Sequence, residues 1–531
     1  MMKRLFTFIA ATVMAVSAMA TNYTDSLAIY INGSETPVVV PATISVDQNS
    51  DGTLKFSLKN FTISRGGQNM YIGNVSVDNV LTFDGKNGRT AFFQAATTTI
   101  ENGDDDSQTW IGPLLGPVDV EIFGYELPDN RLMAKIWFDG GDLECDCYFG
   151  GGFSFVNSGF ENFHKASVSS GENTAESDEP NGWHSFMSAS GDPSLVYLAG
   201  YNPHTFISDV TRPGSKGSKS LMLTSVDMMF AVANGTVTTG RINTGSFTAS
   251  DVANHTWLSL DSTDVDANGD PFYQYMNGRP DSLVLWVKFK QGTPNAEHPY
   301  ATVTAVITDG TYYQLPSDKE YTNILAMARN NQIESKDGAW QRLSIPFDYD
   351  SYTSNNVIGR AILCTISTNA DPGQGSSDTL YVDDAELIYN NEITSVSYKG
   401  ETREATFNSD DDVEVTFTTT GEVNPEDVTF DMSPNSVVFF SGLEKDDDEE
   451  TQDTTTDPTY VWSVCSDDLR SCHNVYVTFK GGTVGINNTP TVSSVQPRAI
   501  YNVNGQRVQT LQKGQVYILR NADGTAKKIL K

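Results

Sequence analysis

The chain has 531 residues, with 67 acidic residues against 34 basic ones and a formal net charge of −33. A chain of this length is too long for one hydrophobic core, so we expect several domains. A surface this acidic repels phosphate backbones and anionic lipids, which argues against a nucleic-acid partner and leaves neutral glycans, calcium ions and basic partners.

The N-terminus carries the pattern of a secretory signal peptide over residues 1–20. Lys3 and Arg4 precede an apolar run from Leu5 to about Ala18, and Ala18-Met19-Ala20 forms an A-x-A cleavage site. The run is shorter than the roughly 18 apolar residues of a membrane span, so we expect an exported chain that is not inserted in the membrane. Its expected location is the periplasm, the cell surface or the extracellular space.

Residues 21–139 consist of short strand-like runs separated by turn signals such as Asn32-Gly33 and Asp51-Gly52. Up-and-down hairpins of this kind favour a small barrel. The expected strands are Ser26–Ile31, Val38–Val46, Leu54–Phe61, Met70–Val80, Thr90–Phe93, Val118–Gly124 and Leu132–Phe138. The whole chain after the signal peptide follows the same pattern, which predicts an all-β fold class.

Three segments of this first unit, Tyr23–Leu27, Asp51–Phe61 and Ile72–Val75, resemble the calycin-like β-barrel domain of secreted bacterial proteins. The resemblance spans nearly the whole unit, and no catalytic motif accompanies it. A barrel of this size either fills with side chains or holds one small ligand, and the filled barrel is the commoner case.

A glycine-rich joint from Gly140 to Gly152 precedes the second unit, residues 153–391. Near the two ends of this unit, Asn157–Phe163 and Thr379–Tyr389 alternate apolar and polar residues. We expect them to be the first and last strands of one β-sandwich. Helical periodicity is nearly absent from the chain, and the best short-helix candidate is Tyr321 to Asn331.

These two terminal segments resemble the ends of jelly-roll carbohydrate-binding modules. Taken with Pro280–Phe289, Trp340–Tyr349 and Gly375–Asp384, they also resemble the family named "putative carbohydrate metabolism domain" of glycan-degrading Gram-negative bacteria. The resemblance implies a jelly-roll fold and a link to carbohydrate, without an established reaction.

The jelly-roll resemblance further implies a structural calcium ion, shared by a glutamate after the opening strand and an aspartate from the closing strand. These positions fall on Glu161 and on Asp383 or Asp384. Strand alternation turns only one of the two aspartates inward, and the family pattern favours Asp384. Calcium takes about six to eight oxygen ligands. The alternative is that these carboxylates only cap strand ends in solvent.

A second acidic segment, Asp264–Asp270, begins like a helix-loop-helix calcium loop, but Tyr275 stands where the closing glutamate should be. We therefore expect a polar surface turn there. The six histidines of the chain show no metal-ligand spacing. His184 and His204 fall in loops of the second unit, where a ligand role is open, although a hydrated surface histidine is the commoner case.

Sugar binding needs aromatic rings for the apolar face of the sugar and polar groups for its hydroxyls. Among the aromatic residues expected on loops, we favour Trp257, Tyr273 and Tyr275 as ligand-binding residues, the alternative being that each only packs. Trp183 matches a glycine-tryptophan pair that packs beside the first strand of related modules, so a core position is expected for it. No catalytic motif occurs, and 67 carboxylates are too many for the sequence to single out a catalytic pair.

Residues 392–485 have the pattern of an immunoglobulin-like β-sandwich, and we expect its strands at Val413–Thr418, Asp427–Met432, Tyr460–Cys465 and Val475–Phe479. Cys465 and Cys472 stand between two of these runs. In an oxidising compartment this spacing predicts a disulfide that closes a hairpin.

Residues 498–531 contain three strand-like runs, Ile500–Val508, Lys513–Leu519 and Lys527–Lys531, and end in a basic, apolar strand. They resemble the C-terminal sorting tails of type IX secretion. The resemblance implies delivery to the cell surface, although Leu519-Arg520 and Asp523-Gly524 depart from the usual ending of such tails.

The function these features favour is a secreted or surface-displayed carbohydrate-binding protein that is not catalytic. The glycan, a polysaccharide or oligosaccharide, would bind on the loop aromatics of the jelly-roll domain. Outer-membrane secretion or glycan-uptake machinery is a further expected partner, and a structural calcium is the expected cofactor. Two alternatives stay open, a glycoside hydrolase or lyase that acts on polysaccharide, and a structural adhesin that binds other proteins.

Overall fold

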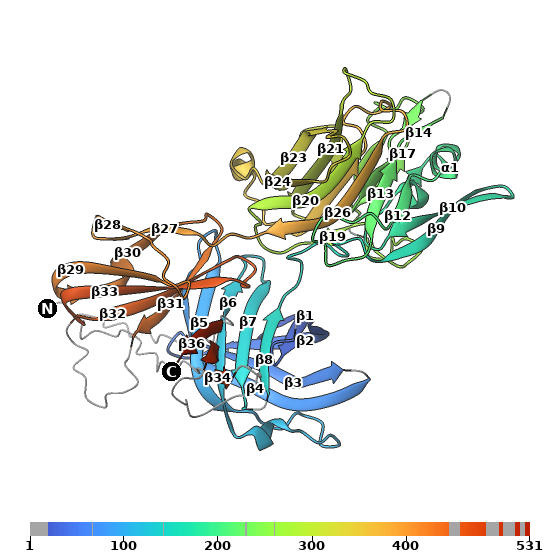
Figure 1. The fold of residues 1–531 in the computed structure, drawn as a ribbon. Helices are drawn as coiled ribbons and strands as arrows, with labels where there is room; N and C mark the ends of the chain where they lie inside the picture. The colour runs from blue at the N-terminus through green and yellow to red at the C-terminus, as the bar shows by residue number, and fades with distance from the viewer. Residues whose placement is uncertain are drawn as a thin grey trace, which may run out of the picture. The chain divides into compact units, whose positions relative to one another are not determined.

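The structure is a computed structural model that describes residues 20–34, 36–65, 67–141, 143–228, 231–259, 261–444, 457–484, 499–502, 516–520 and 526–530. The predicted signal peptide lies outside these residues, apart from Ala20. Strands make up most of the described chain, which confirms the all-β prediction (Figure 1). Within the described residues, the structure contains no helix whose length and hydropathy would let it cross a membrane. The chain divides into two compact units, the first built around the barrel and the second holding residues 150–438.

The first unit is a closed barrel of eight strands in sequence order, β1 to β8. Each strand pairs antiparallel with the next, and β8 closes the barrel by pairing with β1. The strands are β1 (Thr21–Ile31), β2 (Val38–Gln48), β3 (Leu54–Arg65), β4 (Gln68–Asp84), β5 (Thr90–Thr99), β6 (Pro117–Glu126), β7 (Leu132–Asp139) and β8 (Glu144–Phe149), with the 3-10 helix η1 (Gly112–Leu115) before β6.

Strand β8 lies inside the segment that the sequence predicts as a glycine-rich joint, so that prediction is wrong between Glu144 and Phe149. Glycines flank the segment on both sides, but the residues Glu144 to Cys147 alternate between polar and apolar, as in a strand. The open edges of β1 and β7 supply backbone partners for this strand. The barrel therefore runs to Phe149 and not to residue 139.

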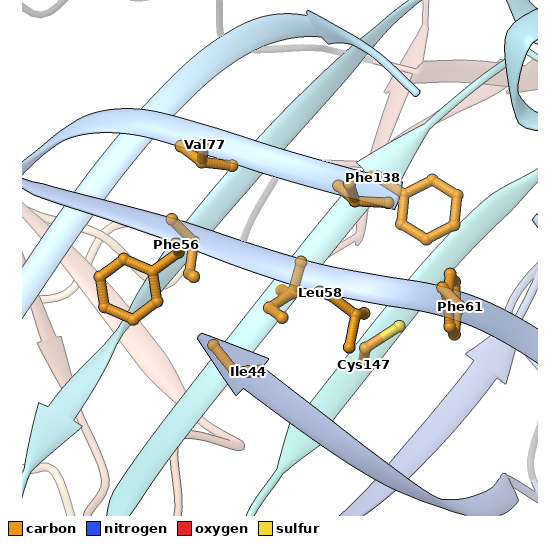
Figure 2. Close-up of a pocket in the computed structure, with 10 residues that line it drawn as sticks. Ile44, Phe56, Leu58, Phe61, Val77, Phe138 and Cys147 are labelled. Carbon is orange, nitrogen blue, oxygen red and sulfur yellow. The ribbon is translucent and has the colours of Figure 1, made fainter. Parts of the chain in front are cut away.

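Buried apolar side chains from the barrel strands pack into one core, and some of them line a small void that Figure 2 shows in close-up. This void has a volume of about 20 Å³, which is close to the space of one water molecule. Its lining is apolar and includes Phe56, Leu58, Phe138 and Cys147. Burial raises the pKa of the Cys145 and Cys147 thiols, so both behave as small core residues. This interior leaves no room for a small-molecule ligand.

The jelly-roll sandwich consists of two five-stranded sheets that enclose one core. The first sheet has the order β12 (Thr205–Ser208), β13 (Ser220–Thr224), β26 (Thr379–Ile388), β20 (Ser282–Lys290), β24 (Gln341–Pro346). The second sheet has the order β16 (Thr236–Thr238), β25 (Ala361–Ser367), β21 (Tyr300–Thr308), β23 (Ile324–Glu334), and β19 (Gln274–Tyr275) also pairs with β25.

Alternation along the strands separates the core from the outer face of the second sheet. On β21, Val303 and Ala305 point into the core while Thr302 and Thr304 occupy the other face. Trp183 is fully buried against Phe155 and Phe160, in the core position that the sequence predicts for it.

Smaller elements surround the sandwich. A four-stranded sheet has the order β11 (Ser190–Gly191), β17 (Arg241–Thr244), β18 (His255–Trp257), β22 (Gln314–Leu315). The hairpin of β9 (Phe163–Ser170) and β10 (Asn173–Pro180) packs against the helix α1 (Pro193–Tyr201). The remaining short elements are β14 (Val226–Asp227), β15 (Val232–Ala233), η2 (Phe186–Ser188) and η3 (Asp350–Asn355).

Two local predictions for this domain are wrong. Residues 157–162 form no strand, since residues 156–159 are a turn, and β9 begins only at Phe163. The expected helix at Tyr321 to Asn331 is instead strand β23, because pairing with β21 overrides the helix propensity of its leucine, alanine, methionine and arginine residues.

The immunoglobulin-like unit has two sheets. The first has the order β28 (Glu401–Glu404), β27 (Ile393–Tyr398), β30 (Val428–Met432), with η4 (Pro425–Asp427) before β30. The second has the order β29 (Val413–Val423), β33 (Cys472–Val484), β32 (Thr459–Cys465), β31 (Val437–Leu443). Cys465 and Cys472 face each other across β32 and β33, and their sulfur atoms are bonded at 2.03 Å. The described part of the C-terminal tail forms a three-stranded sheet of β34 (Ala499–Asn502), β35 (Val516–Arg520) and β36 (Ala526–Leu530).

Candidate functional site

The jelly-roll domain has a cleft of about 440 Å³ over the outer face of the second sheet. Its floor is polar because the strands present alternate residues on this face, and these are mostly hydroxyl and amide side chains. They are Thr236 on β16, Thr365 and Ser367 on β25, Thr302 and Thr304 on β21, and Arg329 and Asn331 on β23.

Side-chain hydrogen bonds, within the second sheet and from β18 to β25, hold this polar floor in place. The Thr302 hydroxyl donates to Oδ1 of Asn331 over 2.7 Å. The hydroxyls of Thr256 and Thr365 lie 2.8 Å apart, and those of Thr236 and Ser367 lie 3.1 Å apart. A hydroxyl has one donor and two acceptor sites, so each of these groups keeps capacity for a ligand after one such bond.

The walls of the cleft are largely apolar. They come from η2, α1, β17 and the loop that follows β17, with residues such as Phe186, Leu195, Ile242 and Phe247. The Phe247 side chain is 65% exposed, which presents an aromatic ring at the cleft. A polar floor with apolar walls and a volume of a few hundred Å³ is the usual make-up of a small-ligand site.

The charge of the cleft is opposite in sign to that of the whole chain. Its described lining includes Arg329 and His255 but no aspartate or glutamate, although the chain has a net charge of −33. The cleft can therefore accept neutral or anionic ligands.

The three aromatic residues favoured by the sequence lie on other surfaces, and none belongs to the described lining of the cleft. Trp257 is on strand β18, where alternation turns its neighbour Thr256 to the cleft, and its ring pairs with that of Tyr312 at 5.8 Å. Tyr273 is half-buried against a cluster that includes Leu258. Tyr275 is on strand β19 and is 42% exposed. The expectation that Trp257 and Tyr275 are loop residues is wrong, since each belongs to a short strand.

Gly159 lies close to both predicted calcium residues, Glu161 and Asp384. A Cβ atom at Gly159 would stand 3.3 Å from Asp384 Oδ1 and 3.9 Å from Glu161 Cγ. A backbone hydrogen bond from the Ala385 amide to the Ser158 carbonyl, 2.9 Å long, ties the opening turn to strand β26 at this point. The two ends of the domain therefore meet, through a turn instead of a strand pair.

Both carboxylates already have partners in this arrangement. Glu161 Oε1 accepts hydrogen bonds from the amides of Ser218 and Lys219, each at 2.9 Å. Although desolvation acts to raise it, the pKa of Glu161 lies below its ordinary value because of these bonds. Asp384 Oδ2 lies 2.5 Å from Arg212 Nε, so an arginine cation supplies the positive charge here.

The buried member of the aspartate pair is Asp383, not Asp384. A bulge opposite Leu285 shifts the register of β26 between the two residues, and Asp384 adopts a left-handed backbone with φ of 45°. Asp383 is fully buried, and desolvation raises its pKa. Its Oδ1 makes no hydrogen bond within the described structure. That one oxygen fits a cation, but calcium would also require Arg212 to release Asp384, so the calcium ion stays a prediction.

The cleft could not be predicted from the sequence, because its floor is built from single residues, mostly with hydroxyl or amide groups, spread over four strands. The signal was present in the strand patterns: Thr302 and Thr304 on one strand, and Thr365 and Ser367 on another, alternate with core residues. Only the pairing of β21 with β25 places the two runs side by side.

Comparison with known proteins identifies the first unit. Residues 19–139 match the sequence profile of the calycin-like beta-barrel domain, and the structure has a closed eight-stranded barrel over these residues and β8. The first unit is a calycin-like β-barrel. The matched segment ends before β8, the strand that closes the calycin-like barrel. No curated protein matches the chain.

Solved structures show only remote likeness to the chain. A Bacteroides fragilis protein named as a "putative outer membrane protein" is 11% identical over 66% of this chain and 97% of its own, with a TM-score of 0.18. The Cry4Aa toxin from Bacillus thuringiensis is 10% identical over 69% of this chain and 52% of its own, with a TM-score of 0.13. A fructofuranosidase from Schwanniomyces occidentalis is 8% identical over 65% of this chain and 79% of its own, with a TM-score of 0.11. At TM-scores this low, these likenesses carry no inference about the chain.

Proposed function

We propose that the chain is a secreted or surface-displayed carbohydrate-binding protein that holds an oligosaccharide, or a segment of a polysaccharide, in the jelly-roll cleft. The observation that carries the proposal is the make-up of that cleft. Its floor offers hydroxyl and amide groups to sugar hydroxyls, and its walls offer Phe247 and other apolar side chains to the C–H faces of the sugar rings.

The same lining favours binding over cleavage. Hydrolysis of a glycosidic bond uses two carboxyl groups on either side of the bond, about 5 to 9 Å apart. The described lining of the cleft includes no carboxylate. Arg329 adds a cation, so glycans that carry a carboxylate or a sulfate are expected to bind more tightly than neutral ones of similar size.

A second candidate surface is the aromatic pair of Trp257 and Tyr312. The Tyr312 side chain is 47% exposed, and its hydroxyl donates to Gln314 Oε1 over 2.7 Å. Stacked or tilted aromatic rings with one wet face can bind a sugar ring without a cleft. Of the three aromatic residues that the sequence favours, Trp257 is the one this surface supports.

Export and surface display rest on the sequence alone. They come from the signal-peptide pattern of residues 1–20 and from the resemblance of residues 498–531 to type IX sorting tails. Secretion or glycan-uptake machinery in the outer membrane is the partner that these features imply.

The test is binding of the mature full chain to a panel of neutral and acidic polysaccharides, with Phe247→Ala and Trp257→Ala variants measured beside it. Loss of binding in Phe247→Ala, with binding kept in Trp257→Ala, supports the cleft. The reverse result moves the site to the aromatic pair. If no glycan binds the wild-type chain while a protein partner does, the proposal fails and the adhesin alternative takes its place.

A further inference from the structure

Three side chains of the jelly-roll domain, none of them in the described cleft lining, point ligand atoms at one another, and a fourth, His184, contacts one of the three. His164 on β9 stands directly opposite Glu179 on β10, and its Nε2 lies 3.6 Å from Glu179 Oε2. Asp266, from the turn after β18, brings its Oδ2 to 3.4 Å from His164 Nε2. His184 Nδ1 lies 3.4 Å from that same Asp266 oxygen. The ligand atoms of His164, Glu179 and Asp266 all lie within 4.8 Å of one another.

The cluster is buried and its facing atoms are not hydrogen-bonded. The side chains of Glu179, His184 and Asp266 are 0% exposed, and that of His164 is 10% exposed. His164 Nε2, Glu179 Oε2, His184 Nδ1 and Asp266 Oδ2 make no hydrogen bond in the described structure. Two buried carboxylate oxygens without hydrogen bonds are costly unless a cation compensates them.

The other oxygen of each carboxylate is fully engaged, which fixes its direction. Glu179 Oε1 accepts hydrogen bonds from the Ser185 amide at 2.5 Å, the Ser185 hydroxyl at 2.7 Å and the Ser188 hydroxyl at 2.9 Å. Asp266 Oδ1 accepts from the amides of Asn268 at 2.9 Å and Asp270 at 2.8 Å. Each carboxylate is thus held with one oxygen aimed into the cluster.

The outer nitrogens of the two imidazoles are also fixed. His184 Nε2 lies 3.1 Å from the Pro271 carbonyl, a group that can only accept, so this nitrogen carries the hydrogen. His164 Nδ1 lies 3.1 Å from Asn181 Oδ1. With the outer nitrogen donating, the inner nitrogen of a neutral imidazole presents a lone pair to the cluster. Metal-binding histidines are oriented by outer contacts of this kind.

We propose that His164, Glu179 and Asp266 bind a divalent transition metal ion of the zinc class, with His184 as a positioning residue beside Asp266. A tetrahedral ion with bonds of about 2.1 Å separates its ligand atoms by about 3.4 Å, close to the 3.6 and 3.4 Å from His164 Nε2 to the oxygens of Glu179 and Asp266. Two carboxylates neutralise the charge of the ion. Imidazole nitrogens disfavour calcium and magnesium, which select oxygen ligands.

The role of this ion is structural. The three donor side chains are buried or nearly so, which restricts access of a substrate to the ion. The ion joins the β9–β10 hairpin to the Asp264–Asp270 turn, and His184, which contacts Asp266, connects this turn to the segment that leads into η2. This inference does not depend on the proposed carbohydrate binding.

The test uses the mature full chain without a histidine tag, stripped with a chelator, reloaded with zinc or cobalt, and dialysed. Bound metal is measured by mass spectrometry and by the visible spectrum of the cobalt form. The matched pair of variants is Asp266→Asn and Asp264→Asn. Asp264 lies in the same turn and binds Arg241 at 2.8 Å, so its replacement disturbs the turn without touching the cluster.

The proposal predicts near-stoichiometric zinc in the wild type and in Asp264→Asn, loss of most of it in Asp266→Asn, and a tetrahedral cobalt spectrum with nitrogen and oxygen ligands. If Asp266→Asn does not fold, the cobalt spectrum and a rise of the wild-type melting temperature with zinc decide the question. A wild-type chain that retains no metal after dialysis overturns the proposal, as does equal retention by the folded Asp266→Asn variant. In that case the cluster is an ion-paired network with a protonated His164.

Discussion

His184 Nδ1 and Asp266 Oδ2 lie 3.4 Å apart in the jelly-roll domain, and neither atom makes a hydrogen bond in the described structure. Two groups that both present lone pairs repel each other unless a proton or a metal ion lies between them. The surrounding hydrogen bonds hold them in this position, which is the arrangement expected around a metal ion.

The Ser185→Ala variant tests the support of this cluster. It removes the 2.7 Å hydrogen bond from the Ser185 hydroxyl to Glu179 Oε1. Loss of such an outer contact typically lowers metal affinity by about 10–100-fold. Competition with a zinc chelator measures the change, with Ser169→Ala on the same hairpin as the control. Equal zinc affinity in all three proteins would contradict the supporting role of the Ser185 hydroxyl, since Glu179 Oε1 keeps its bonds to the Ser185 amide and the Ser188 hydroxyl.

The Arg212→Gln variant tests the predicted calcium residues. Arg212 bonds Asp384 through Nε and Asp383 through its backbone amide at 3.0 Å, and its guanidinium lies over the Trp286 ring. Loss of the charge-assisted bond to the partly buried Asp384 carboxylate should lower the free energy of unfolding by about 1.5 kcal/mol when a chelator keeps calcium out of the solution. If the carboxylates can hold calcium, the ion should restore stability in this variant more than in the wild type. A melting temperature that does not respond to calcium in either protein would remove calcium from this site.

The free energy of unfolding should fall in acid, because aspartates at turns accept hydrogen bonds in their charged form. The pKa values of Asp51 and Asp261 lie below the ordinary value of 3.8. The main cause is a hydrogen bond donated to each carboxylate by the hydroxyl of Thr53 or Thr263, and the second is a hydrogen bond from the backbone amide of the same threonine. A folded-state pKa below the unfolded value stabilises the fold above pH 3.8, and this contribution is lost as the pH falls through the folded-state pKa. The Asp51→Asn/Asp261→Asn double variant should therefore lose less stability than the wild type between pH 7 and pH 3 in urea unfolding. Identical losses would contradict this assignment.

The filled barrel predicts a large penalty for truncating its core. Phe138 is 1% exposed and lines the small void. The Phe138→Ala variant should lower the free energy of unfolding of the barrel by about 3–5 kcal/mol. Urea unfolding measures the effect, and Val39→Ala, at a side chain that is 61% exposed, serves as the control. A cost for Phe138→Ala as small as that of the control would mean that the barrel interior is loosely packed.

The sequence predicted most of the barrel because its strands alternate and its turns carry asparagine-glycine or aspartate-glycine pairs. It missed β8 because the glycines around Glu144–Phe149 have the composition of a linker. It also assigned a helix to residues that form β23, since only the pairing with β21 decides between the two structures.

The metal cluster could not be read from sequence spacing. His164 and Glu179 are neighbours only because the β9–β10 hairpin turns at Gly171 and Glu172, and Asp266 comes from a distant turn. The sequence predicted that turn, and the calcium-loop alternative for Asp264–Asp270 included Asp266, but no pattern linked Asp266 to His164 and Glu179. In the same way, the calcium prediction expected Glu161 and Asp384 to converge. It could not show that the Arg212 guanidinium already pairs with the Asp384 carboxylate, which calcium would have to displace.

The most direct test of the proposed function is hydroxyl-radical footprinting of the full chain with and without the best-binding glycan. The method reports the solvent exposure of single aromatic side chains, and the candidates differ in position: Phe247 is at the cleft, whereas Trp257, Tyr312 and Tyr275 are elsewhere. Binding in the cleft predicts a fall in the oxidation of Phe247 alone among these four. Unchanged oxidation of Phe247, with protection of Trp257 and Tyr312, would contradict the cleft as the carbohydrate site.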